Sequence, residues 1–446
     1  MIKCLTTIAV LVLAILVLSA TLTLTGCTGK IRTKSPENIA EKTETPYKEK
    51  QQKNGKQKPQ NETRRPQNGN QKPEETANPV KELISNMTLE EKVGQLVIVG
   101  LEGYAMDENA RSMIEDYHVG GFILFGRNVE NANQLLDLIN SLKVTNSKKK
   151  VPIFISVDQE GGRVNRMPEE LIKLPSGRVV GEVNDEDLSY EIGGVIAEQL
   201  RSFGFNMNFA PVLDIDSNPK NPVIGDRSYG SSAEIVSKLG MESMKGIRKG
   251  GIIPVVKHFP GHGDTFVDSH IGLPTVDSDI DRLNDFELVP FIEAINNRAD
   301  AVMVAHILIN KIDPEYPASL SKIIIKDILR RELNFNGVVI TDDITMGAIT
   351  ENYDIGDAAV RAVNAGSDIV LVCHGHDNRI AVLDALTKAV QNGTIPEKRL
   401  DESVYRILKL KHKYRMTDNT VDSVDIDKIN DKISDILNKI SLPSEE

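Results

Sequence analysis

The chain has 446 residues, of which 40% are hydrophobic and 26% charged, and its formal net charge is −11. This composition is typical of a soluble domain with a large core, and it excludes collagen-like, coiled-coil and wholly disordered chains. Lys3 and a net charge of +5 over residues 30–79 leave −17 for residues 80–446. Because so acidic a domain repels phosphates, we expect no nucleic-acid partner.

The first segment has the features of an export signal. Lys3 precedes an uncharged stretch from Leu5 to Leu24 that is long enough to cross a bilayer. The stretch ends in Leu24-Thr25-Gly26-Cys27, which resembles the bacterial lipoprotein box. We therefore expect residues 1–26 to be a cleaved signal peptide and Cys27 to carry a lipid that anchors the protein to the cell membrane, on its extracytoplasmic side. An uncleaved signal anchor, in which Cys27 has no role, is the alternative.

Residues 27–79 are predicted to be a disordered basic tether. They are rich in Lys, Arg, Pro, Gln and Asn and contain few large apolar side chains, so they cannot bury a core. With Cys4 removed and Cys27 lipidated, Cys373 is the one remaining cysteine. We therefore expect no disulfide within the chain, in spite of the exported location.

From Leu83 onward, short apolar runs alternate with amphipathic segments, a pattern that predicts strand–helix units around a parallel sheet. The runs are Gln95 to Gly100, Gly121 to Phe125, Pro152 to Val157, Asn206 to Ile215, Ile252 to Lys257, Ala301 to Ala305, Gly337 to Thr341 and Asp368 to Cys373. Eight strands with intervening helices predict an α/β fold, a (β/α)8 TIM-like barrel that forms a single catalytic domain over residues 80–416. An open doubly wound sheet is the alternative, although no Gly-x-Gly-x-x-Gly turn follows the first run.

Residues 417–446 form an acidic tail. Isoleucines recur in it at helical spacing, at Ile426, Ile429, Ile433, Ile436 and Ile440. The tail is therefore expected to pack as an additional helix.

Polar residues end several of the apolar runs, and barrel enzymes take their catalytic groups from the carboxyl ends of strands. The run-end residues are Asp158, Asp214, Lys257, His258, His306, Asp342, Asp343 and His374. Six of the eight histidines lie at or shortly after such ends, namely His258, His262, His270, His306, His374 and His376. Any one of these residues alone also fits a structural role, but their clustering predicts a site at this end of the barrel.

The segment from Lys257 to His270 contains most of this chemistry. Pro260, Gly261 and Gly263 disfavour a helix, so we expect a long loop after the fifth strand. Its three histidines and two aspartates are also types of metal ligand. Their spacing does not match the common zinc sites, and we expect neither a metal nor another cofactor.

Four motifs resemble glycoside hydrolase family 3, and within it the bacterial β-N-acetylhexosaminidases of NagZ type. They are Val157-Asp158-Gln159-Glu160-Gly161-Gly162-Arg163-Val164-Asn165-Arg166, Gly225-Asp226-Arg227-Ser228-Tyr229-Gly230, the loop from Lys257 to His270, and Thr341-Asp342-Asp343-Ile344-Thr345-Met346. The resemblance extends from about Leu83 to Met416, and the loop ending in Asp268-Ser269-His270 is its most specific part.

The resemblance implies a role for each matching residue. Asp342 matches the nucleophile, His270 the acid/base and Asp268 the carboxylate that orients the imidazole. Strand alternation is expected to point Asp343 away from Asp342. The residues that match those holding the sugar hydroxyls and the N-acetyl group are Asp158, Arg166, Arg227, Lys257 and His258. His306, His374 and His376 match no role in the family, and we expect them at the rim of the site.

The resulting prediction is an exo-acting, retaining β-N-acetylglucosaminidase that works as a monomer. It would remove terminal GlcNAc from a glycan, expected to be a peptidoglycan fragment, through a covalent glycosyl-enzyme on Asp342. A phosphorylase that transfers the sugar to phosphate is one alternative, since a histidine acid/base does not repel an anion. A non-catalytic wall-binding lipoprotein is the other.

Overall fold

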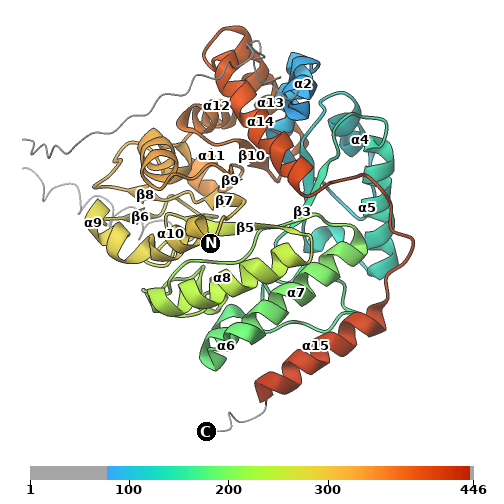
Figure 1. The fold of residues 1–446 in the computed structure, drawn as a ribbon. Coiled ribbons are helices and arrows are strands. Elements are labelled where there is room, and N and C mark those ends of the chain that lie inside the picture. Colours follow the sequence, from blue (N-terminus) through green and yellow to red (C-terminus); the bar gives the residue numbers. More distant parts are fainter. Residues whose placement is uncertain (1–77, 442–446) are drawn as a thin grey trace, which may run out of the picture. The chain divides into compact units, whose positions relative to one another are not determined.

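The computed structural model describes residues 78–441, which form a closed barrel of parallel strands surrounded by helices (Figure 1). Going round the barrel, the order is β1-β2-β3-β4-β5-β7-β9-β10, and β10 pairs with β1 to close it. The strands are β1 Val97–Gly100, β2 Gly121–Leu124, β3 Phe154–Val157, β4 Met207–Asn208, β5 Ile253–Phe259, β7 Ala301–Val304, β9 Val338–Asp343 and β10 Ile369–Val372. The predicted (β/α)8 barrel is confirmed, and all eight apolar runs contribute a strand.

The barrel strands are rich in Val and Ile and are buried along nearly their whole length, as expected for strands covered on both faces. Helices follow each strand and cover the outside of the barrel (Figure 1). The helices from the first strand to the last are α4 Glu108–Glu115, α5 Ala132–Asn146, α6 Gly177–Val183, α7 Glu186–Phe203, α8 Ala233–Lys249, α9 Ile280–Arg282, α10 Val289–Asn296, a helical segment Ile323–Glu332, α11 Gly347–Thr350, α12 Ile355–Ala365 and α13 His376–Gln391. Two helices precede the barrel, α2 Pro79–Ser85 and α3 Leu89–Gln95, and α14 Glu397–Lys413 follows it.

Local sequence signals explain where the helices begin and end. The side chain of Asp185 accepts a hydrogen bond from the Leu188 backbone and so caps the start of α7. That helix ends at Gly204, whose φ of 96° is strained for other residues. These two signals set the bounds of α7, the helix before β4.

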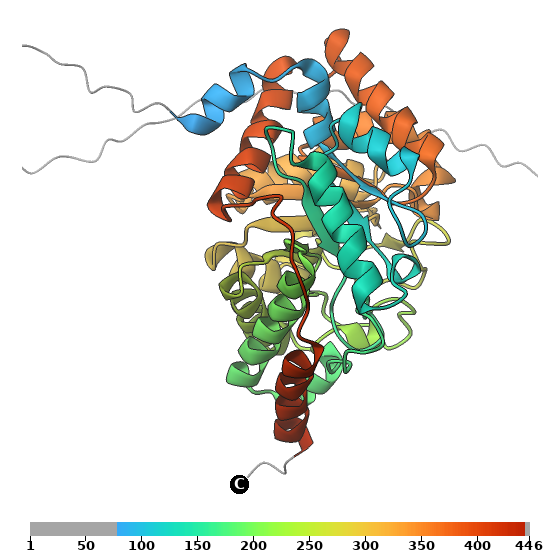
Figure 2. The same cartoon turned by 90° about the vertical axis from the view of Figure 1, so that its right-hand side faces the viewer.

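The acidic tail contains the amphipathic helix α15, Ile426–Ser441, which packs against α7. Figures 1 and 2 both show α15 beside α7, reached by an extended connection from the end of α14. Its buried residues are Ile429, Ile433 and Ile436. The connection is held to α5 by a pair of hydrogen bonds between Asn140 and the backbone of Val421.

Two details differ from the expected elements. The run from Asn206 to Ile215 pairs as a strand over only Met207–Asn208 and returns to the sheet at a single bridge between Val212 and Lys257. Pro211 lies between these two points and lacks the N–H that a continuous ladder needs. A short parallel pair, β6 Thr275–Val276 and β8 Leu308–Ile309, was not predicted because two-residue strands leave no periodicity.

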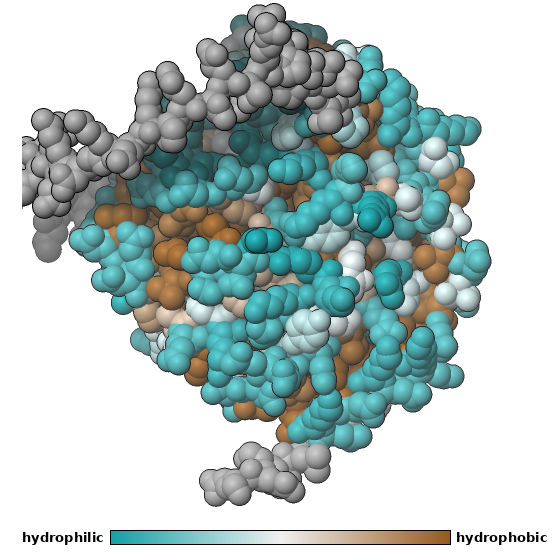
Figure 3. Space-filling view, viewed as in Figure 1, coloured by the Kyte–Doolittle hydropathy of each residue, from teal (hydrophilic) through white to brown (hydrophobic). Residues whose placement is uncertain are grey.

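The predicted signal peptide, the tether up to residue 77 and the lipidation of Cys27 lie outside the described residues. From Asn78 to Ser441, no helix is both long and apolar enough to cross a membrane. The face in Figure 3 is mostly hydrophilic, with hydrophobic side chains in smaller groups among the polar ones.

Candidate active site

A pocket of about 570 Å³ lies at the carboxyl ends of the barrel strands. Its floor consists of apolar barrel residues, namely Ile123, Phe209, Met303 and Leu371. All eight predicted catalytic and sugar-binding residues line it: Asp158, Arg166, Arg227, Lys257, His258, Asp268, His270 and Asp342. The structure therefore brings together residues that are up to 184 positions apart in the sequence, from Asp158 to Asp342.

One wall of the pocket is a buried ionic network around Glu160. Arg227 donates two hydrogen bonds to the Glu160 carboxylate, at 2.8 and 2.7 Å, and Lys257 Nζ lies 2.7 Å from Glu160 Oε1. Lys257 also donates to Asp158 Oδ1 at 2.5 Å. Burial alone raises the pKa of the Glu160 carboxyl, but Arg227 and Lys257 outweigh it and hold that pKa well below its usual range. The network therefore stays ionised and holds Arg227 and Lys257 in place at the pocket wall.

Glu160 was not predicted as a site residue. It stands in the motif that carries Asp158 and Arg166, so the signal was present in the sequence. Its loop turns at Gly161 and Gly162, whose φ values are 96° and 57°.

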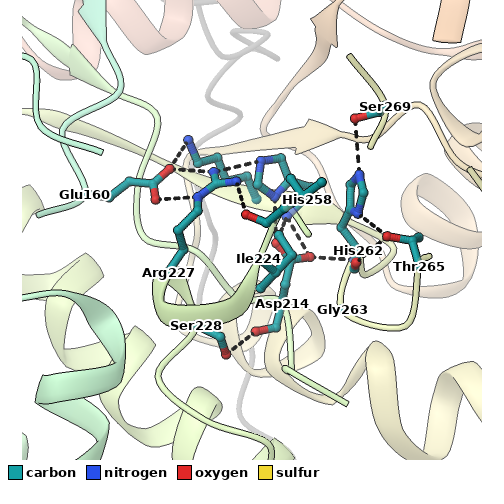
Figure 4. A network of polar contacts seen from close by, with 12 residues as sticks. Glu160, Asp214, Ile224, Arg227, Ser228, His258, His262, Gly263, Thr265 and Ser269 are labelled. Atoms are coloured by element: carbon teal, nitrogen blue, oxygen red, sulfur yellow. Dashed lines mark hydrogen bonds and ion pairs between the residues drawn. The ribbon is translucent and has the colours of Figure 1, made fainter. Parts of the chain in front are cut away.

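Asp214 is a second buried carboxylate that sequence reasoning left without a role. Its Oδ2 lies 2.6 Å from His258 Nδ1, and its Oδ1 accepts the backbone N–H of His262 at 2.6 Å (Figure 4). Burial raises the pKa of Asp214, but His258 and His262 outweigh this and lower it. An ionised Asp214 only accepts hydrogen bonds, so Nδ1 of His258 carries the hydrogen and Nε2 is turned toward Arg227, at 3.5 Å from its Nη2.

Asp342 and Asp343 end β9 but have different surroundings. Asp343 accepts hydrogen bonds from Thr345 N, Thr345 Oγ1 and Cys373 N, at 3.0, 2.6 and 3.0 Å. Asp342 accepts one from the backbone N–H of Asp343, at 2.8 Å. Burial raises the pKa of Asp342, but His306, His258 and Lys257 together lower it below its usual value. Asp342 is therefore an ionised carboxylate with lone pairs available, whereas Asp343 is engaged in holding two loops.

His270 and Asp268 form a hydrogen-bonded pair at the mouth of the pocket. His270 Nδ1 lies 2.7 Å from Asp268 Oδ1, which also accepts the His270 backbone N–H at 2.9 Å. Burial raises the pKa of Asp268, but its contacts with His270 lower it overall, so it is ionised. Nδ1 then donates to this carboxylate, and Nε2 is left to exchange a proton.

The three histidines expected at the rim have different positions. For His306 the expectation is wrong: the ring is fully buried between β7 and β9, with Nδ1 2.6 Å from Ser319 Oγ and Nε2 2.9 Å from the Asp343 carbonyl oxygen. His374 does lie at the rim, exposed and 5.7 Å from the Phe125 ring. His376 begins α13 and does not line the pocket. The position of a histidine in the sequence predicts that it lies at a strand end. It does not predict whether its side chain points into the core or toward the rim of the pocket.

Within residues 78–441, no group of three or more His, Cys, Asp or Glu side chains is arranged to share a metal ion. The pocket is instead lined by charge pairs, an ionised carboxylate and an imidazole. Such a set suits acid–base and nucleophilic chemistry.

Comparison with known proteins identifies the family. The family model described as "Glycosyl hydrolase family 3 N terminal domain" matches residues 88–410. The chain belongs to glycoside hydrolase family 3. The chain is 37% identical over 325 residues to "Beta-hexosaminidase A" of Pseudoalteromonas piscicida, a match that covers 68% of the chain and 54% of the relative. The chain thus spans about half the length of that relative.

Two solved structures resemble the chain. A family 3 β-N-acetylglucosaminidase from Paenibacillus sp. is 44% identical with a TM-score of 0.75, and the match covers 79% of this chain and 69% of that one. NagZ from Neisseria gonorrhoeae, in complex with N-trifluoroacetyl-D-glucosamine, is 32% identical with a TM-score of 0.65, and the match covers 78% and 98% of the two chains.

Proposed function

We propose that this glycoside hydrolase is an exo-acting, retaining β-N-acetylglucosaminidase. The observation that carries the proposal is the presence, in one pocket, of the ionised Asp342 carboxylate and the His270–Asp268 pair. The similar β-hexosaminidase and β-N-acetylglucosaminidase, and NagZ with its bound N-trifluoroacetyl-D-glucosamine, support the choice of sugar.

The reaction would proceed by two displacements. Asp342 attacks the anomeric carbon, the glycosidic bond breaks, and the Nε2 proton of a doubly protonated His270 moves to the leaving oxygen. In the second step, His270 takes a proton from water, whose oxygen attacks the same carbon and releases Asp342. Asp268 stabilises the imidazolium in the first step and keeps Nε2 directed outward in the second.

The sugar would be held by the pocket wall that contains the ionic network around Glu160. Asp158 and Lys257 form an ion pair that presents both an acceptor and donors to sugar hydroxyls. Arg166, Arg227 and His258 line the same pocket and complete the set proposed to hold the hydroxyls and the N-acetyl group. The buried apolar residues Ile123, Phe209, Met303 and Leu371 line the pocket on the barrel side, and a pocket closed there would accept the end of a glycan.

Turnover of 4-nitrophenyl β-GlcNAc, followed by NMR of the first-formed anomer, tests the proposal. Release of β-configured GlcNAc supports a retaining hydrolase. Accumulation of GlcNAc-1-phosphate in phosphate buffer would instead identify the phosphorylase, and lack of turnover on any β-GlcNAc glycoside would favour a non-catalytic wall-binding protein. A comparison of GlcNAc-anhydromuramyl, GlcNAc-muramyl and chitobiose substrates tests the proposed action on peptidoglycan fragments.

We also propose that the protein is anchored outside the cytoplasm by a lipid on Cys27. The support is the apolar stretch that ends in Leu24-Thr25-Gly26-Cys27. Cys27→Ala should leave an unprocessed precursor without lipid, because both lipid transfer and cleavage depend on that residue. Metabolic labelling with a lipid probe and the molecular mass of the mature chain measure this. Normal processing of Cys27→Ala would contradict the proposal, and Cys4→Ala is the matched control.

A further inference from the structure

Two buried groups, Asp214 and His262, lie between the sugar-binding wall and the loop that carries His270 (Figure 4). Asp214 is 0% exposed and His262 is 1% exposed, and neither takes part in the proposed reaction. Burial of polar groups costs free energy unless they are hydrogen-bonded, so their contacts indicate what they stabilise.

The segment that carries His270 has little apolar packing of its own. Phe266 and Ile271, which flank it, are 68% and 72% exposed. Two polar contacts join residues 266–272, the segment around His270, to other parts of the described chain, and both involve Ser269. Its carbonyl oxygen accepts the backbone N–H of Ala348 at 3.1 Å, and its hydroxyl oxygen lies 3.3 Å from His262 Nε2.

His262 is itself held on its other sides. Its backbone N–H donates to Asp214 Oδ1 at 2.6 Å, and its Nδ1 lies 2.9 Å from Thr265 Oγ1. The next residue, Gly263, packs so closely against the segment after β4 that a Cβ there would lie 1.6 Å from the Ile215 carbonyl oxygen. The imidazole of His262 is therefore a fixed point to which Ser269 can be attached.

The same carboxylate that holds His262 also holds His258. Asp214 Oδ2 lies 2.6 Å from His258 Nδ1, and His258 lines the sugar pocket. The chain of contacts from His258 through Asp214 and His262 to Ser269 ends next to both members of the acid/base pair, Asp268 and His270.

We propose that His262 is a positioning residue for the acid/base histidine. Its ring contacts Ser269, and its backbone N–H donates to the Asp214 carboxylate that orients His258. His262 thereby attaches Ser269, and with it the Asp268–His270 pair, to Asp214. This inference rests on the proposed function, in which His270 protonates the leaving group. Loss of the His262 ring nitrogens should therefore impair proton transfer. His262 also lines the pocket, but the residues proposed to hold the sugar should stay in place.

The test compares wild type with His262→Phe, which removes both ring nitrogens, and with Ser269→Ala, which removes the same contact from the loop side with little risk to folding. Asp264→Asn is the matched control, since this loop residue does not line the pocket. Each protein is assayed for kcat/KM on 2,4-dinitrophenyl β-GlcNAc, whose leaving group needs almost no proton, and on chitobiose, whose leaving group needs one. Product inhibition by GlcNAc reports on the sugar pocket, and hydrogen–deuterium exchange of residues 264–273 reports on the loop directly.

Both test variants should lose about tenfold or more in kcat/KM on chitobiose relative to the dinitrophenyl glycoside, with GlcNAc inhibition unchanged and faster exchange over residues 264–273. The control should behave as wild type. Exchange equal to wild type in both variants would overturn the attachment, and equal losses on both substrates would overturn the positioning role. Wild-type protein that cleaves neither glycoside would contradict the proposed function, and the exchange measurement would still decide whether His262 holds the loop.

Discussion

At the scale of single residues, the neighbouring aspartates Asp342 and Asp343 differ in their hydrogen bonds. The carboxylate of Asp343 accepts three hydrogen bonds and ties the end of β9 to the backbone of Cys373. Asp342 accepts one hydrogen bond and is otherwise available. Both carboxylates line the pocket, so the expected opposite directions along the strand do not separate them. The difference arises from the contacts with Thr345 and Cys373, which engage Asp343 and have no counterpart at Asp342.

Asp342→Asn should therefore abolish turnover with the fold intact, because an amide cannot form the glycosyl-enzyme. We expect a loss of at least about a thousandfold in kcat, by analogy with other covalent catalysts. A 2- or 5-fluoro sugar inactivator followed by peptide mass spectrometry should place the label on Asp342 in wild type. A label on Asp343 would reverse the assignment.

His262 also predicts an acid-sensitive contribution to stability. Burial and the nearby His258 lower its pKa to about 4, from 6.5. Between these two values the unfolded chain binds a proton that the folded chain does not, so the free energy of unfolding falls as the pH falls through this window, by about 3 kcal/mol at most. Above pH 6.5 both states are neutral at this residue and the effect vanishes.

Urea denaturation at pH 7.5 and 4.5 measures this effect. Acidification should destabilise wild type more than His262→Phe, which lacks the titrating group, and Asp264→Asn should follow wild type. Parallel losses in wild type and His262→Phe would show that the ring does not stay neutral in the folded protein.

At the scale of elements, apolar periodicity in the sequence predicted the strands and helices that are long enough to show it. The eight barrel strands and α15 arise from apolar patterns long enough to identify. The predicted strand over Asn206 to Ile215 was too long, because Pro211 interrupts the ladder. Motifs predicted the eight residues that line the pocket together. The contacts of Glu160, Asp214 and His306 depend instead on which way buried side chains point, and strand position alone does not give that direction.

Helix α15 offers a separate test of packing at this scale. Ile433 is fully buried against α7, so Ile433→Asp should detach the helix and expose Ile429 and Ile436 as well. We expect a loss of about 3 kcal/mol or more in the free energy of unfolding. Turnover at 25 °C should change little, because α15 contributes no residue to the pocket. Thermal denaturation measures the loss, and Asn438→Asp, the same gain of charge at an exposed position, should leave it unchanged.

At the scale of the molecule, the chemistry is confined to the barrel. The residues that line the pocket lie between Ile123 and His374. A fragment of residues 78–446 should therefore have a kcat/KM within about twofold of that of the full chain on a soluble aryl glycoside. Circular dichroism checks that the fragment is folded. A folded fragment with a much lower kcat/KM would show that the first 77 residues contribute to the site.

The floor of the pocket is apolar and consists of Ile123, Phe209, Met303 and Leu371. It affects the way in which an oligosaccharide substrate would be degraded. In the proposed reaction, a released sugar would lie between the floor and the remaining chain, so it would leave through the mouth by which it entered. The shortened chain must withdraw first, and the next chain end to arrive comes from any molecule in solution. On the proposed function, we therefore expect distributive degradation of an oligosaccharide, with every shorter length accumulating in turn.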